Sequence, residues 1–107
     1  MNQIAILNDA LRTSFNPACG RIVMTSGFAS MPAEIKDKVL RQIAEFTDFT
    51  RDNDPHGEHD FISVGIEDQK FFAKIDYFDL TLSCGSENPA DPAVTIRVMT
   101  IMRAEDY

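Results

Sequence analysis

Two segments of alternating apolar and polar residues, separated by a short polar break, constrain the fold of this chain most. In "FISVGI", residues 61–66, and "KFFAKIDYF", residues 70–78, every second side chain is apolar, so each extended segment has one apolar face. These apolar residues are Ile62, Val64, Ile66, Phe71, Ala73, Ile75 and Tyr77. The intervening "EDQ" indicates a hairpin turn. The sequence therefore predicts two adjacent antiparallel strands.

Two further segments have the periodicity of helices. In "NQIAILNDALRTSF", residues 2–15, apolar residues recur at helical spacing and Asn2 is a candidate cap. In "SMPAEIKDKVLRQIAEFTDF", residues 30–49, Pro32 lies near the first turn, and Ile35, Val39, Ile43 and Phe46 fall along one face. The sequence predicts one helix in each segment.

Two more strands are predicted at either end of this pattern. "GRIVMTSGFA", residues 20–29, is a β-branched segment bounded by glycines, and "AVTIRVMTIM", residues 93–102, alternates with Val94, Ile96 and Val98 on one face. The polar "GSENPADP", residues 85–92, is expected to be a loop. We therefore expect an α+β fold, with a four-stranded, mainly antiparallel sheet and two helices packed on one face. The last three strands are expected to form a meander.

The length of the chain favours one domain over residues 1–107, because 107 residues leave room for one core. No segment approaches the roughly 20 apolar residues that a membrane helix needs, and the amino end lacks a basic start followed by an apolar stretch. Cys19 and Cys84 are the only cysteines and have no CxxC spacing. We expect a cytoplasmic protein with reduced thiols and no contact with a membrane.

The charge of the chain restricts its partners. It has 17 acidic and 10 basic residues, for a net charge of −7. Such a chain repels phosphate backbones, which disfavours direct binding to nucleic acid. A protein partner with a basic surface fits this charge better. The same charge also occurs in acidic domains that simply need to stay soluble.

The segment "DNDPHGEHD", residues 52–60, concentrates carboxylates and both histidines of the chain. One interpretation is a divalent metal site, for zinc or manganese, whose ligands would be His56, Glu58, His59 and Asp60. The other is a turn between a helix and a strand, because Asp, Asn, Pro and Gly satisfy the amides of turns. The turn interpretation explains every residue type except the two histidines.

The blocks "DNDPHGEHDF", "KIDYFD" and "SENPADPAVTIRVMTIMRAEDY" resemble successive blocks of the uncharacterised bacterial domain of unknown function 3768 family. The similarity covers the chain from "LNDALRTSF" onward. The resemblance implies a setting on plasmids and other mobile elements of Alphaproteobacteria, where short acidic proteins protect an incoming element from host nucleases. It implies no catalytic residue.

Charge and resemblance together predict a small acidic binding protein, such as an anti-CRISPR or anti-restriction inhibitor, that binds a nucleic-acid-handling host complex. The predicted partner-binding residues are Asp52, Asp54, Glu58, Asp60, Glu67, Asp68, Asp76 and Asp79. The alternative is a metal-binding module or metal-dependent hydrolase centred on "DNDPHGEHD". A third hypothesis is an interaction subunit, which an exposed apolar patch would distinguish. No catalytic motif supports an enzyme, and outside the metal alternative we expect no cofactor.

Overall fold

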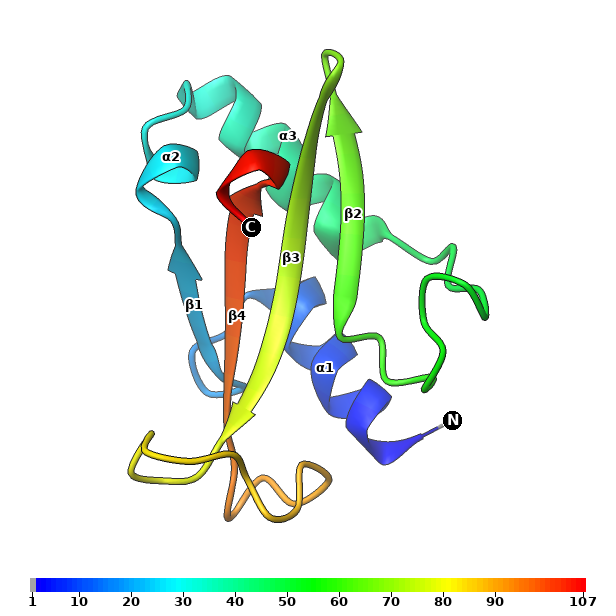
Figure 1. Ribbon diagram of the computed structural model, residues 1–107, viewed down its shortest axis with the longest axis vertical. Helices are drawn as coiled ribbons and strands as arrows, with labels where there is room; N and C mark the ends of the chain where they lie inside the picture. The colour runs from blue at the N-terminus through cyan, green and yellow to red at the C-terminus, as the bar shows by residue number, and fades with distance from the viewer. Residues whose placement is uncertain (1) are drawn as a thin grey trace.

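The structure is a computed structural model that describes residues 2–107. Four strands and three α-helices make up the fold, and a short 3-10 helix, η1, follows the last strand (Figure 1). In chain order the elements are α1 (Gln3–Ser14), β1 (Arg21–Met24), α2 (Ser26–Ala29), α3 (Ala33–Glu45), β2 (Phe61–Ile66), β3 (Gln69–Phe78), β4 (Ile96–Arg103) and η1 (Ala104–Asp106).

The four strands form one sheet in the order β1-β4-β3-β2. β2 pairs with β3 and β3 with β4, both antiparallel, which confirms the predicted meander. β1, however, pairs in parallel with β4, from Arg21 opposite Val98 to Met24 opposite Ile101. The sheet is therefore mixed, and the prediction of a mainly antiparallel sheet was wrong. Alternation identifies extended residues but not the strand with which they pair, so this parallel edge had no signal in the sequence.

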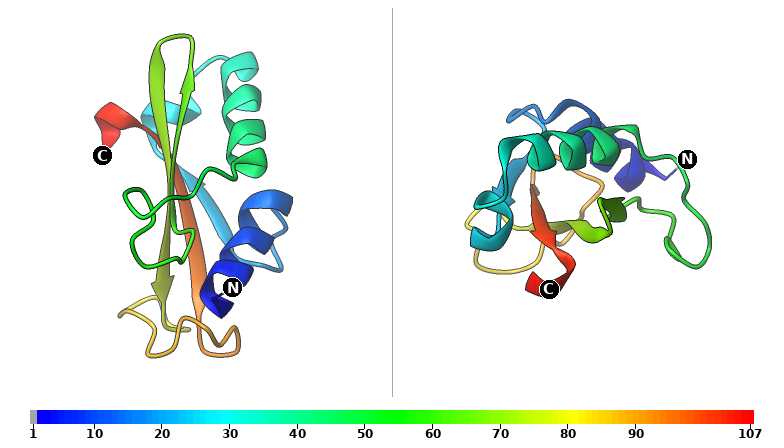
Figure 2. Two further views of the ribbon diagram at one scale, coloured as in Figure 1. Left: turned by 90° about the vertical axis from the view of Figure 1, so that its right-hand side faces the viewer. Right: turned by 90° about the horizontal axis from the view of Figure 1, so that it is seen from above.

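Helices α1 and α3 lie on the same side of the sheet, and η1 lies on the other side (Figure 2). The core lies between these helices and the sheet. It contains Leu11, Phe28, Val39, Ile43, Ile62, Val64, Ile66, Phe71, Ala73, Ile75, Met99 and Ile101. The apolar faces predicted for residues 61–66 and 70–78 thus face this core, although Tyr77 at the end of β3 is only half-buried.

The prediction for the last strand needs correction. Its inner face carries Arg97, Met99 and Ile101, all of which are buried, and Thr95 just before the strand is buried as well. Ile96 and Val98 share the opposite, half-exposed face, and Val94 precedes the strand and is exposed. Both faces of this segment are largely apolar, so alternation alone could not show which face is buried. The buried face of β4 also carries a charged residue, Arg97, which interrupts its apolar pattern in the sequence.

The predicted strand over residues 20–29 was also too long. It ends at Met24, and the Thr25 hydroxyl then accepts a hydrogen bond from the Phe28 amide at 3.3 Å and caps the four-residue helix α2. The Phe28 side chain is fully buried, and its ring meets that of Phe71 edge-on at 5.8 Å. Residues 2–107 therefore contain three α-helices where we predicted two.

The remaining predicted elements agree with the structure within a few residues. The Asn2 side chain caps α1 by accepting from the Ile4 amide at 2.7 Å. α3 ends at Glu45, and Phe46 is extended but still packs against the core. The turn between β2 and β3 consists of Glu67 and Asp68, both with positive φ, as a two-residue hairpin requires. No helix in residues 2–107 combines the length and apolar character needed to cross a bilayer.

Candidate functional site

Two long connections lie toward the same end of the sheet, away from the β2–β3 hairpin (Figure 1). Residues 46–60 join α3 to β2, and residues 79–95 join β3 to β4. Together they contain eight acidic residues and one basic residue, Arg51. The eight are Asp48, Asp52, Asp54, Glu58, Asp60, Asp79, Glu87 and Asp91. We call these two connections the acidic end.

Tyr77, near the end of β3, contacts both connections of the acidic end. Its hydroxyl donates a hydrogen bond to Glu58 Oε1 at 2.8 Å, and its backbone oxygen accepts from the Ser86 amide at 3.1 Å. The Ile75 amide also donates to the backbone oxygen of Asp60 at 2.8 Å. The two connections are therefore fixed to the same strand within a few residues of one another.

Asn8 and Arg97 complete this arrangement beneath the acidic end. Asn8 Nδ2 donates to the Tyr77 hydroxyl at 2.8 Å and to the backbone oxygen of Glu58 at 3.0 Å. Asn8 Oδ1 accepts from Arg97 Nε at 2.9 Å, and Arg97 Nη2 donates to the backbone oxygen of Pro89. We call Asn8, Glu58, Tyr77 and Arg97 the central network. It links α1, both acidic connections and the two middle strands.

Burial determines the electrostatics of the central network. Arg97 is only 3% exposed, and this burial lowers the pKa of its guanidinium, while the charge of Glu58 acts in the opposite direction. Burial also raises the pKa of the Tyr77 hydroxyl, and its hydrogen bond to Glu58 adds to that effect. The hydroxyl therefore stays protonated and keeps donating to Glu58. The Arg97 guanidinium lies 5.3 Å from the centre of the Tyr77 ring, within cation–π distance.

A second group of contacts surrounds His59. Its Nδ1 lies 3.0 Å from both carboxylate oxygens of Asp9, and its Nε2 lies 3.6 Å from Asp54 Oδ2. The imidazole stacks on the Phe49 ring, with a centroid distance of 3.8 Å and an interplanar angle of 3°. Asp9 also accepts from Arg12 Nε at 2.8 Å. These contacts fix the segment around His59 to α1.

Asp54 shapes the backbone of the same segment. Its Oδ1 accepts from the amides of Glu58 and His59, both at 3.1 Å, and His59 has a φ of 56°. A left-handed backbone is uncommon outside glycine, and the two hydrogen bonds stabilise it here. Gly57, with a φ of 66°, occupies the turn just before them. The turn interpretation of "DNDPHGEHD" thus describes what most of its residues do.

The four predicted metal ligands lie in this segment, and two of them, Glu58 and His59, are engaged by other side chains of the protein. Both ring nitrogens of His59 face carboxylates, and Glu58 accepts from Tyr77. Burial raises the pKa of Asp60, as do the charges of Glu58 and Asp54. His56 is exposed. Within residues 2–107, no group of three or more His, Cys, Asp or Glu side chains is arranged to hold a metal ion.

The predicted partner-binding residues lie in several different parts of the structure. Asp52 is exposed, and Asp54 and Glu58 are turned into the contacts described above. Asp76 lies 3.4 Å from Lys74 Nζ, and Asp79 accepts from the amides of Thr81 and Ser83. Glu67 and Asp68 occupy the β2–β3 hairpin at the far end of the sheet (Figure 1). The residues from 52 to 60 and Asp79 are thus brought to one end, and the hairpin pair is not.

Sequence reasoning missed several residues of this site. Asn8 and Arg97 of the central network have polar side chains at buried positions of a helix and a strand, and the partners of Asn8 are 50 to 89 residues away in sequence. Glu87 and Asp91 add carboxylates to the acidic end. A signal for these two was present, because residues 76–96 contain four acidic residues and no basic one.

The acidic end also exposes apolar side chains. Leu80, Leu82 and Val94 are 60%, 40% and 36% exposed, and all three belong to the connection between β3 and β4. Exposed large apolar residues beside polar ones are typical of surfaces that bind other proteins. The interaction subunit, for which a contiguous apolar patch was the expected sign, stays a prediction.

Comparison with known proteins identifies a family but no activity. The family model described as "Protein of unknown function (DUF3768)" matches residues 24–106, which is well over half of the chain. The match begins at residue 24, later than the segment "LNDALRTSF" at which the similarity was expected to begin. No curated protein and no solved structure matches the chain.

Proposed function

This chain belongs to the family of unknown function DUF3768, and we propose that it is a small acidic binding protein of a mobile element. In this proposal it acts in the cytoplasm of a bacterial host as a counter-defence inhibitor, of the anti-CRISPR or anti-restriction kind. It binds a basic surface on a nucleic-acid-handling protein complex, and it does not bind nucleic acid itself.

The observation that carries this proposal is the concentration of carboxylates at the acidic end. Eight of the 17 acidic residues fall in its two connections, with Arg51 as the only basic residue. Such a concentration of one sign of charge attracts a surface of the opposite sign and speeds the encounter with it. A protein that normally handles nucleic acid presents that kind of surface, because it must neutralise phosphates.

The central network supports the proposal because it fixes the position of the two connections before a partner arrives. Tyr77 contacts one connection through its hydroxyl and the other through its backbone, and Arg97 holds the second connection at Pro89. A surface that is already ordered loses less entropy on binding than a flexible one. The exposed Leu80 and Leu82 supply apolar area next to the carboxylates.

The test is a pull-down of the tagged protein against lysate from a host that carries active CRISPR and restriction systems. We expect a nuclease complex to be retained at low salt and released at high salt, because salt screens exposed charges. Retained proteins are identified by mass spectrometry. Retention of nothing beyond the untagged control, or retention that high salt leaves unchanged, would contradict the electrostatic mechanism.

Two matched charge variants locate the binding surface. The first, Asp48→Asn with Asp52→Asn and Glu87→Gln, removes three exposed carboxylates of the acidic end. The second, Glu34→Gln with Asp37→Asn and Asp68→Asn, removes three exposed carboxylates from α3 and the hairpin. Each changes the net charge by the same amount. We expect the first to reduce retention at least about tenfold and the second to change it little. Equal losses in both would show that only total charge matters.

A further inference from the structure

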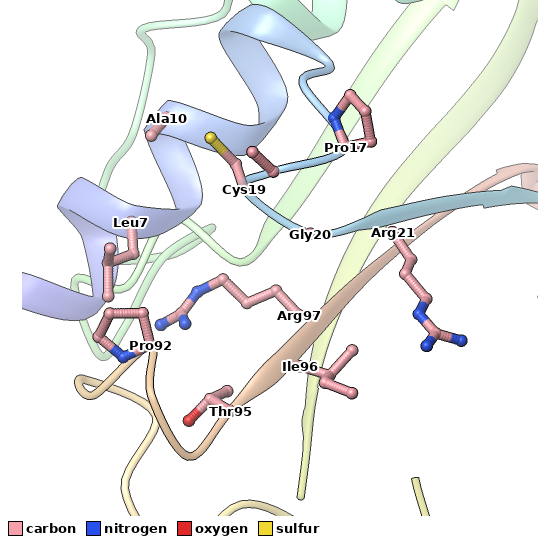
Figure 3. Close-up of a pocket in the computed structure, with 11 residues that line it drawn as sticks. Leu7, Ala10, Pro17, Cys19, Gly20, Arg21, Pro92, Thr95, Ile96 and Arg97 are labelled. Carbon is pink, nitrogen blue, oxygen red and sulfur yellow. The ribbon is translucent and has the colours of Figure 1, made fainter. Parts of the chain in front are cut away.

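A pocket of about 380 Å³ opens where the start of β1 and the start of β4 meet α1. Figure 3 shows the side chains around it, with Leu7 and Ala10 contributed by α1, Pro92 and Thr95 by the segment that leads into β4, and Ile96 by the start of β4. Its volume lies within the range of sites that bind small molecules. The pocket is distinct from the exposed carboxylates of the acidic end.

The charge of the pocket is opposite to that of the protein. Its lining includes two arginines, Arg21 and Arg97, and no acidic residue, in a chain whose net charge is −7. The Arg97 side chain reaches under α1 between Leu7 and Pro92, whereas the Arg21 guanidinium points away from the others (Figure 3). Arg97 is therefore the cation that a molecule in this pocket would meet.

The guanidinium of Arg97 still has a donor to offer. Its Nε donates to Asn8 and its Nη2 to Pro89, while within residues 2–107 no hydrogen bond is formed by Nη1. Within residues 2–107, every side-chain nitrogen or oxygen that is shielded from solvent forms a hydrogen bond. Nη1 must therefore be accessible to solvent, at the pocket that Arg97 lines.

Within residues 2–107 Arg97 forms no hydrogen bond or ion pair with a carboxylate, although the charge of Glu58 acts on it from a distance. Among the described residues its hydrogen-bond acceptors are an amide side chain and a backbone carbonyl, and both are neutral. A buried charge is normally paired, because leaving water costs free energy that a nearby opposite charge can offset. An anion in the pocket would supply that opposite charge.

We propose that this pocket binds a small organic carboxylate, whose carboxyl group pairs with Arg97 Nη1 and whose apolar body packs against Leu7, Pro17 and Ile96. One free guanidinium nitrogen and a mostly apolar lining suit a monoanion with a hydrocarbon body. A phosphate group needs more donors than this lining offers. This site adjoins the proposed partner surface, because Pro92 and Thr95 belong to the connection between β3 and β4, but its lining includes none of the carboxylates on which that surface depends.

The test is a titration of the full-length, ¹⁵N-labelled protein with hexanoate, its neutral analogue hexanamide, and inorganic phosphate. We expect hexanoate to shift the amide resonances of residues 7–10, 17–21 and 92–97, which line the pocket, and to bind at least about tenfold more tightly than hexanamide, because a charge-assisted hydrogen bond is made only with the carboxylate. Binding of hexanamide with equal affinity, tighter binding of phosphate, or shifts outside these residues would overturn the proposal.

Three variants connect the binding to the pocket. Arg97→Met removes the cation and should abolish hexanoate binding. Ala10→Phe fills the pocket from an exposed position of α1 and should also abolish hexanoate binding. It still tests whether the pocket is the binding site if Arg97→Met does not fold. Arg21→Gln removes the arginine that points away and should leave the affinity unchanged. Full hexanoate affinity in Ala10→Phe, or its loss in Arg21→Gln, would contradict the assignment to Arg97.

Discussion

Asn8→Leu is expected to lower the free energy of unfolding by about 3 kcal/mol or more. Asn8 is fully buried, and its amide forms hydrogen bonds with Tyr77, Glu58 and Arg97. Leucine has a similar volume, so the substitution removes the hydrogen bonds without leaving a large cavity. It leaves Arg97 Nε, on a buried and charged side chain, without an acceptor, which is the costliest of the three losses. Urea unfolding measures the change.

The same variant should also loosen the acidic end. Asn8 contacts Glu58 and Tyr77 directly. We therefore expect the substitution to speed amide hydrogen exchange more in residues 46–60 and 79–95 than in the β2–β3 hairpin. Gln42→Leu is the matched control, because Gln42 is an exposed amide side chain on α3 and its replacement should change stability by less than about 0.5 kcal/mol. A loss in Asn8→Leu no larger than in this control would show that the central network contributes nothing to stability.

Phe28→Ala is expected to lower the free energy of unfolding by about 3–5 kcal/mol. The ring is fully buried and meets Phe71, which is equally buried, edge-on. Alanine loses the transfer free energy of the ring and leaves a cavity between α2 and the sheet. Thermal or urea unfolding, with the slope of the transition compared with that of the unmodified protein, measures the effect.

Leu80→Ala is the control for Phe28→Ala. Leu80 is 60% exposed in the connection between β3 and β4, so its truncation should cost less than about 0.5 kcal/mol. If Phe28→Ala were tolerated as well as Leu80→Ala, the position of α2 against the sheet would be wrong.

The elements that the sequence predicted well are those in which a local pattern and the buried face agree. Ile62, Val64 and Ile66 are buried in β2 as predicted, and Ser63 and Gly65 between them lie on the exposed face of the strand. The elements that it predicted poorly depend on distant partners. The pairing of β1 with β4 joins residues nearly 80 positions apart, and α2 is stabilised by the contact of Phe28 with Phe71.

The candidate site was predicted in part for the same reason. "DNDPHGEHD" was recognised as a polar turn with clustered carboxylates, and it is one. Sequence could not show that Asp54 and Glu58 face inward, since that depends on the turn at Gly57 and on Tyr77. Nor could it show that residues 79–95 lie at the same end, because that placement rests on contacts of Tyr77 and Arg97.

The most direct test of the central claim, that the acidic end is the surface that attracts a basic partner, is a titration of ¹⁵N-labelled protein with a short oligolysine peptide at low and at high salt. We expect amide shifts concentrated in residues 46–60 and 79–95 at low salt, and their disappearance at high salt as the charges are screened. Shifts centred on Glu67 and Asp68 in the hairpin or on the outer face of α3, or shifts that high salt does not reduce, would contradict the claim.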